Sequence, residues 1–80
     1  MSGSTLRRGD RGPEVFELQR RLQRVGAYWG PEDGVYSERV EEAVAEFQRR
    51  ARVMSDPSGV YGPETRRALE AWTSGREHRS

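Results

Sequence analysis

Cysteine and lysine are both absent from this chain of 80 residues, so all 14 basic residues are arginine. Without cysteine the chain forms neither disulfides nor a thiolate zinc site, and its single histidine, His78, is too little for a metal site. We therefore expect no metal and no cofactor. Long hydrophobic runs are also missing: no segment approaches the roughly 20 apolar residues of a transmembrane helix, and no basic stretch leads into the hydrophobic part of a signal peptide. We expect a segment that has no membrane partner and carries no export signal of its own.

The chain has little net charge. Its 13 acidic residues nearly balance the arginines and leave a formal charge of +1, which argues against a polyanion as partner. A helix-turn-helix needs a turn of about three or four residues, whereas the connections predicted below run to about ten. We therefore expect no nucleic-acid binding.

Apolar residues recur with the period of an α-helix in three segments, although only 32% of the chain is hydrophobic. The first segment, about 13–25, begins with Pro13 at the first helical position, and the second, about 38–52, follows Ser37 as N-cap. The third, about 63–72, again begins with a proline and ends where small polar residues follow. The expected apolar faces consist of Val15, Leu18, Leu22 and Val25, then Val40, Ala43, Val44, Phe47 and Ala51, then Ala68, Leu69 and Trp72.

A Gly-Val-Tyr turn occurs twice, as Gly34-Val35-Tyr36 and as Gly59-Val60-Tyr61, with the same offset of 25 residues to the helical apolar residues that follow. Two loop-helix units of one design are expected to pack with approximate two-fold symmetry, closed on one side by the first helix. The sequence predicts an all-α fold, a compact three-helix bundle over residues 6–72. Residues 1–5 and 73–80 are small, polar and aperiodic, and we interpret them as flexible tails.

An ordered series of short motifs runs through this domain: Leu6-Arg7-Arg8-Gly9-Asp10-Arg11-Gly12-Pro13-Glu14-Val15, Leu18-Gln19-Arg20-Arg21-Leu22, Gly26-Ala27-Tyr28, Asp33-Gly34-Val35-Tyr36, Ala43-Val44 with Phe47-Gln48, and Gly59-Val60-Tyr61-Gly62-Pro63-Glu64-Thr65 with Ala68-Leu69. The series resembles the bacterial peptidoglycan-binding domain family of type 1, a three-helix cell-wall module often attached to lytic enzymes. One departure follows the first Gly-Val-Tyr, where the family usually has Gly-Pro-x-Thr and this chain has Ser37-Glu38-Arg39-Val40.

The resemblance implies a non-catalytic module that binds peptidoglycan, through glycan strand or stem peptide, and anchors an attached or associated lytic enzyme to the wall. It also implies a location in the cell envelope or outside the cell, and we expect a monomer. The sequence leaves one alternative open, in which the same bundle is a protein-interaction module that docks on a partner or catalytic domain.

Catalysis by the chain itself is not expected. Glycoside hydrolysis needs two carboxylates about 5 to 10 Å apart across a cleft. The acids of the second predicted helix face outward between arginines, no cysteine nucleophile exists, and the only histidine stands near the end. We therefore assign no catalytic residue.

Aromatic residues near the two loops are the first candidates for ligand contact, because saccharides bind on aromatic faces flanked by polar groups. Tyr36 and Tyr61 are equivalent in the repeat, and each has a competing interpretation as a buried residue whose hydroxyl bonds the backbone. Tyr28 and Trp29 are adjacent and cannot both point inward, so we expect at least one of them at the surface.

Polar candidates lie on the second predicted helix. Gln48 either presents its amide to a ligand or holds loop backbone in place. Arg49 and Arg52 stand near the helix end, where cations are favoured by the helix dipole and are often merely solvated. We include both as ligand-binding candidates because a stem-peptide carboxylate is a partner for either.

Overall fold

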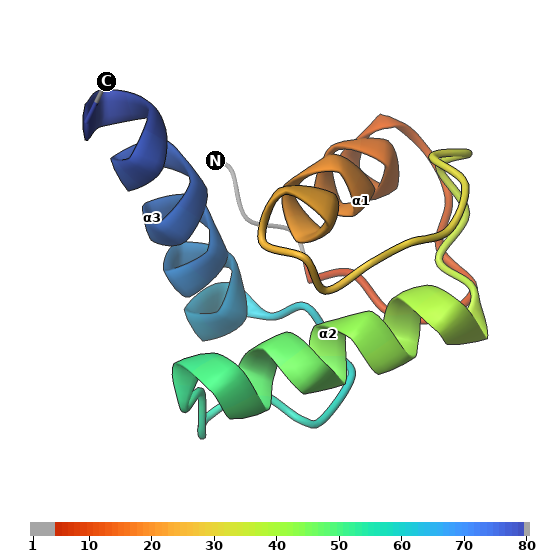
Figure 1. The fold of residues 1–80 in the computed structure, drawn as a ribbon. Helices are drawn as coiled ribbons and strands as arrows, with labels where there is room; N and C mark the ends of the chain where they lie inside the picture. The colour runs from red at the N-terminus through yellow and green to blue at the C-terminus, as the bar shows by residue number, and fades with distance from the viewer. Residues whose placement is uncertain (1–4, 80) are drawn as a thin grey trace.

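The computed structural model describes residues 5–79, with side chains up to Ser74, so His78 and the ends of both predicted tails lie outside the described side chains. Within this range the chain forms three α-helices and no strand: α1 (Pro13–Arg24), α2 (Glu38–Ala51) and α3 (Pro63–Arg79). Figure 1 shows α1 lying over α2, with α3 beside both. The predicted all-α three-helix fold is confirmed.

The helix starts follow the predicted signals. Pro13 is the first residue of α1, and the Ser37 side chain accepts a hydrogen bond from the Val40 N–H at the start of α2. The helix ends differ, because after α1 a glycine, Gly26, takes the positive φ of 78°, whereas Arg52 takes φ 60° after α2. Residues other than glycine rarely adopt this conformation.

The third helix is longer than predicted. The expected end at Trp72 is wrong, because the helix continues through Thr73 and on to Arg79. Thr73 is buried, its hydroxyl bonds the carbonyl oxygen of Leu69 at 2.9 Å, and it receives a hydrogen bond from the Arg21 guanidinium of α1. A threonine that bonds a carbonyl one turn earlier is compatible with a helix. The polar residue interpreted as a helix end is therefore a tertiary contact.

The N-terminal segment ties the two Gly-Val-Tyr turns together. Tyr36 donates its N–H to the carbonyl oxygen of Asp10 at 2.9 Å and accepts from the N–H of Gly9 at 3.0 Å. Tyr61 exchanges the same kind of bonds with Leu6, at 2.8 and 3.0 Å. Both turns are thereby held on one short N-terminal segment, which fixes their positions relative to each other.

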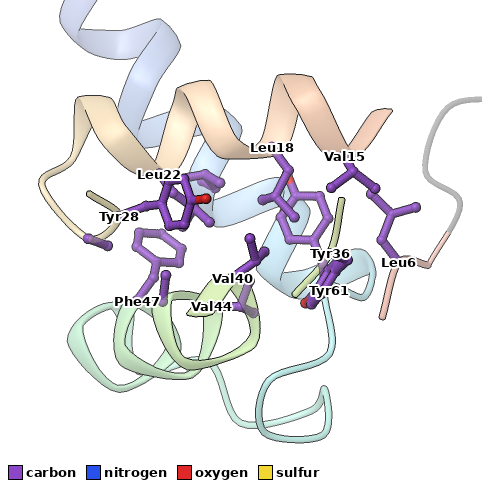
Figure 2. Packing of buried hydrophobic residues seen from close by; sticks show 13 residues of the cluster. Leu6, Val15, Leu18, Leu22, Tyr28, Tyr36, Val40, Val44, Phe47 and Tyr61 are labelled. Atoms are coloured by element: carbon purple, nitrogen blue, oxygen red, sulfur yellow. The ribbon is translucent and has the colours of Figure 1, made fainter. Parts of the chain in front are cut away.

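The core lies between α1 and α2 and is closed by the tyrosines. Figure 2 shows the α1 side chains above those of α2, Tyr28 between Leu22 and Phe47 at one end, and Tyr36 and Tyr61 near Leu6 at the other. Trp72 of α3 meets Phe47 edge-on, with ring centroids 5.0 Å apart. The most deeply buried apolar residues of the helices are Val15, Leu18, Leu22, Val40, Val44, Phe47 and Leu69.

Candidate functional site

The loop between α2 and α3 is supported by Gln48. Its Nε2 donates to the carbonyl oxygens of Pro57 and Val60, at 3.1 and 3.0 Å, and to the Thr65 hydroxyl at 3.0 Å. Its Oε1 accepts the Gly59 N–H at 2.8 Å. The side chain is only 4% exposed, so its amide is committed to the loop and not available to a ligand. The structure favours the scaffold interpretation of this residue.

The loop between α1 and α2 has a matching support in Gln19. The Oε1 atom accepts the Gly34 N–H at 2.9 Å, and Nε2 donates to the Val35 carbonyl oxygen at 3.1 Å. Nε2 also donates to Oδ1 of Asp33 at 3.1 Å and lowers the pKa of that carboxyl, helped by the Val35 N–H. Each glutamine thus holds the glycine and valine of its own Gly-Val-Tyr turn.

Tyr28 supplies a hydroxyl that the first loop otherwise lacks. Thr65 gives a hydroxyl to the second glutamine, but the residue 25 positions earlier is Val40, which has none. The Tyr28 hydroxyl lies 3.5 Å from Nε2 of Gln19 and donates to the Pro31 carbonyl oxygen at 2.6 Å. The ring is buried, and burial raises the pKa of Tyr28, with the negative charge of Asp33 as the next cause. Of the two adjacent aromatics, Tyr28 is therefore the one that points inward.

Tyr36 and Tyr61 are buried as well. The Tyr36 hydroxyl donates to the Gly59 carbonyl oxygen at 2.6 Å and so joins the first turn to the second. Burial raises the pKa of Tyr61 to about 12 and also raises the pKa of Tyr36. The Arg66 guanidinium lies 4.9 Å from the centre of the Tyr61 ring. Neither ring presents a face to solvent, so the structure favours their interpretation as scaffold.

Trp29 has the opposite environment, because 77% of it is exposed. It borders a groove of about 300 Å³ that also includes Arg39, Glu42 and Glu46 of α2. This surface combines an accessible indole with charged hydrogen-bonding groups of α2. Such a combination suits the apolar face and the hydroxyl or acetamide groups of a sugar.

The Trp29 groove is continuous with a second hollow. Arg39 and Glu42 also line a neighbouring hollow of about 630 Å³, which reaches Pro31 and Ser37 at the start of α2. The shared side chains make the two hollows one surface along the N-terminal half of α2. An extended ligand is therefore able to contact both.

A further hollow, of about 420 Å³, lies between the start of α1 and the loop, next to Phe16. Phe16 is 39% exposed, and the Arg20 guanidinium stands 6.0 Å from its ring centre. Phe16 is thus less accessible than Trp29, and its ring already has the Arg20 guanidinium nearby. We regard the Trp29 groove as the stronger candidate.

Arg49 and Arg52, the remaining candidates, line a separate groove of about 290 Å³ at the C-terminal end of α2. Both are exposed, and Met54, 86% exposed, borders the same groove. Residues three or four apart adjoin on a helix surface, so Glu46 and Arg49 bring the two grooves next to each other on the outer face of α2. The structure therefore leaves Trp29, Arg49 and Arg52 at the surface and places Tyr28, Tyr36, Gln48 and Tyr61 inside.

Several side chains of these grooves were not among the sequence candidates, including Arg39, Glu42, Glu46 and Met54. The first two stand three residues apart on the polar face of α2, a pattern typical of any solvated helix, so the sequence held no distinct signal for them. Among the described residues, no cluster of histidine, cysteine, aspartate and glutamate side chains is arranged to hold a metal ion. Over the same residues, no helix combines the length and apolar character that crossing a membrane requires.

The comparison with protein families bears directly on this bundle. The model of a family described as "Putative peptidoglycan binding domain" matches residues 11–69, which include α1, α2, both loops and the first part of α3. This chain belongs to that family. The family membership expected from the motif series is thereby confirmed.

Relatives of this peptidoglycan-binding domain include wall enzymes. The chain is 38% identical over 73 residues to a protein named probable N-acetylmuramoyl-L-alanine amidase of Bacillus licheniformis, covering 88% of this chain and 20% of the relative. It is also 38% identical over 68 residues to the spore cortex-lytic enzyme of Bacillus subtilis (strain 168), covering 85% and 22%. The chain thus spans about a fifth of the length of these relatives.

Among solved structures, the domain is similar to the SleB N-terminal domain. The TM-score is 0.83 at 34% identity, and the match covers 91% of this chain and 97% of that one. The likeness therefore extends over most of both chains.

Proposed function

We propose that this chain is a non-catalytic module that binds bacterial cell-wall peptidoglycan. The observation that carries the proposal is the match of the peptidoglycan-binding family to residues 11–69. The accessible groups of the candidate grooves support it. An indole suits the apolar face of a sugar, and guanidinium groups and carboxylates suit its hydroxyl or acetamide groups. The absence of cysteine from the chain and the position of its single histidine near the end are in keeping with a non-catalytic role.

We further propose that the module holds a lytic enzyme against the wall, in the cell envelope or outside the cell. The relatives named as an amidase and as a cortex-lytic enzyme support this, because the matching part is about a fifth of each. A binding module keeps its linked catalytic domain at a high effective concentration near the polymer. Its contribution is then to local concentration and not to chemistry.

The Trp29 groove is our proposed site for the glycan strand. The exposed indole offers a rigid apolar face at small entropic cost, and Arg39 and Glu42 stand beside it to bond hydroxyl or acetamide groups. The continuation of the groove toward Pro31 gives room for more than one sugar along α2. Trp29 is the side chain on which we expect binding to depend most.

Co-sedimentation with insoluble purified peptidoglycan tests the function. We expect the parent chain to pellet with the polymer, and Trp29→Ala to bind about tenfold more weakly, since losing one stacked aromatic commonly costs an interface more than 1 kcal/mol. Phe16→Ala is the matched control, because it removes a partly exposed aromatic from a different hollow. A folded parent chain that stays in the supernatant at micromolar concentration would refute the proposed function. Equal binding by the parent and Trp29→Ala, with loss in Phe16→Ala, would move the site to the Phe16 hollow.

A further inference from the structure

Arg52 stands at a backbone position that favours glycine. Its φ of 60° and ψ of 41° are left-handed, and every other positive φ among the described residues belongs to a glycine. At the end of α1 the same task is performed by Gly26. A non-glycine residue in this conformation is strained, and such strain often marks a position selected for its side chain. The backbone therefore does not account for an arginine here.

Capping of α2 does not account for it either. The carbonyl oxygens of Arg49 and Gln48 in the last turn already accept the N–H groups of Arg52 and Val53, at 3.3 and 2.9 Å. Charge at the helix end is supplied by Arg50 as well, whose guanidinium bonds the Val25 carbonyl oxygen at 2.8 Å and Glu46 at 3.2 Å. The side chains of Arg49 and Arg52 have no such partner among the described residues. Neither forms an ion pair with the carboxylate of their own groove, that of Asp56, whose Oδ2 accepts the N–H and the hydroxyl of Thr65.

The rest of the groove limits what this pair binds. Beside the guanidinium groups it is lined by the apolar side chains of Ala45, Val53 and the highly exposed Met54, and by the polar residues Gln48, Asp56 and Ser58. Arginine binds carboxylates in paired hydrogen bonds, and the adjoining apolar wall suits small side chains such as that of alanine. A neutral sugar would leave the guanidinium groups without a counter-charge, and a phosphate polymer would leave the apolar wall uncovered. A short peptide with a free carboxylate satisfies both.

We propose that Arg49 and Arg52 bind a carboxylate of the peptidoglycan stem peptide. The assignment rests on the proposed function and names the part of the polymer that this second groove binds. Because the groove adjoins the Trp29 groove along α2, strand and peptide would be bound by neighbouring faces of one helix. Arg52 is then retained for the ligand at the expense of backbone fit.

Arg52→Gly gives the sharpest test, since the two roles of the residue predict opposite changes. We expect the melting temperature to stay level or to rise by up to about 5 °C, because glycine relieves the left-handed strain. We expect affinity for intact walls and for a purified stem peptide to fall about tenfold, as for the loss of a charge-assisted hydrogen bond. Arg49→Gln removes the partner without touching the backbone and should weaken binding similarly. Arg67→Gln, an exposed arginine of α3 outside these grooves, is the control of equal charge change and should bind like the parent.

Three wall preparations separate the outcomes. Intact walls test the proposed function, peptide-free glycan strands made with an amidase remove the stem peptide, and walls treated with hydrofluoric acid lack phosphate polymers. We expect the parent to bind intact and acid-treated walls and to bind peptide-free glycan about tenfold more weakly. Undiminished binding by Arg52→Gly and Arg49→Gln would overturn the proposal, as would equal parent binding to peptide-free glycan or the absence of saturable binding of the purified stem peptide. Loss on acid-treated walls alone would assign the pair to a phosphate polymer instead and overturn it too.

Discussion

Replacing Gln48 with alanine is expected to unfold the second loop before anything else. The substitution removes four hydrogen bonds to described residues and leaves the Gly59 N–H and the Pro57 and Val60 carbonyl oxygens without the amide that now bonds them. At about 1 kcal/mol net for each bond, with partial replacement by water at the exposed side, the loss is about 3 kcal/mol. A domain of this length is stable by roughly 4 to 12 kcal/mol, so the loss is a large fraction of the total. We expect the melting temperature to fall by roughly 12 to 24 °C.

Thermal and urea unfolding, followed by circular dichroism, measure this effect. Gln23→Ala is the matched control, because Gln23 lies on α1 and is only partly buried, and we expect a change within about 0.5 kcal/mol. Gln48→Glu tests the same hydrogen bonds in a second way. The glutamate Oε1 still accepts the Gly59 N–H, but the charged carboxylate also faces the oxygen atoms to which the Gln48 amide donated. We expect this variant to be less stable than the alanine variant at neutral pH and to recover in acid, where the carboxyl is protonated and donates again. A Gln48→Ala variant as stable as Gln23→Ala would refute the view that this amide holds the loop.

Three further predictions follow from the tyrosines. Tyr36→Phe removes the hydroxyl from the Gly59 carbonyl oxygen and should cost about 1 to 2 kcal/mol in urea unfolding, whereas an unchanged midpoint would contradict the bond. Tyr28→Phe should cost about 1 kcal/mol yet leave co-sedimentation with peptidoglycan unchanged; weakened binding without lost stability would return Tyr28 to the ligand site. The pKa values of all three tyrosines are raised above 10.0, with that of Tyr61 at about 12, so the folded chain holds protons that the unfolded chain releases near pH 10. The tyrosines' contribution to the free energy of unfolding should therefore be level below pH 10 and fall as pH rises toward 12, and tyrosinate absorbance at pH 10 should be small until urea is added.

The helices and their order were predictable from local sequence signals. Pro13, Ser37 and Pro63 each act within one helical turn, and the repeated Gly-Val-Tyr fixed the spacing of the two units. The end of α3 was not readable, because Thr73 is buried by a contact with Arg21, which lies 52 residues away. By local propensity, a threonine followed by serine and glycine is typical of a helix end. The tertiary contact with Arg21 instead makes Thr73 part of the bundle.

The candidate site was predictable in kind but not residue by residue. Their adjacency in the sequence predicted that Tyr28 and Trp29 would not both be buried. The choice between them depends on Gln19, whose amide meets the Tyr28 hydroxyl only once α1 and the following loop are folded. The exposure of Arg49 and Arg52 agrees with their place at a helix end. The left-handed backbone of Arg52 had no sequence signal, since arginine is not a residue expected there.

The departure from the family pattern and the exposed tryptophan are connected through Tyr28. Val40 deprives the first loop of the hydroxyl that Thr65 gives the second, and Tyr28 replaces it by turning inward to Gln19 and the Pro31 carbonyl oxygen. Tyr28 is buried, whereas the adjacent Trp29 is exposed and borders the groove with Arg39 and Glu42. In the first copy of the turn, Tyr28 therefore supports the loop from inside, and the adjacent Trp29 presents an aromatic face to solvent. The second copy, which obtains its hydroxyl from Thr65 in the first turn of α3, needs no such tyrosine and presents Met54 and the arginine pair in its place.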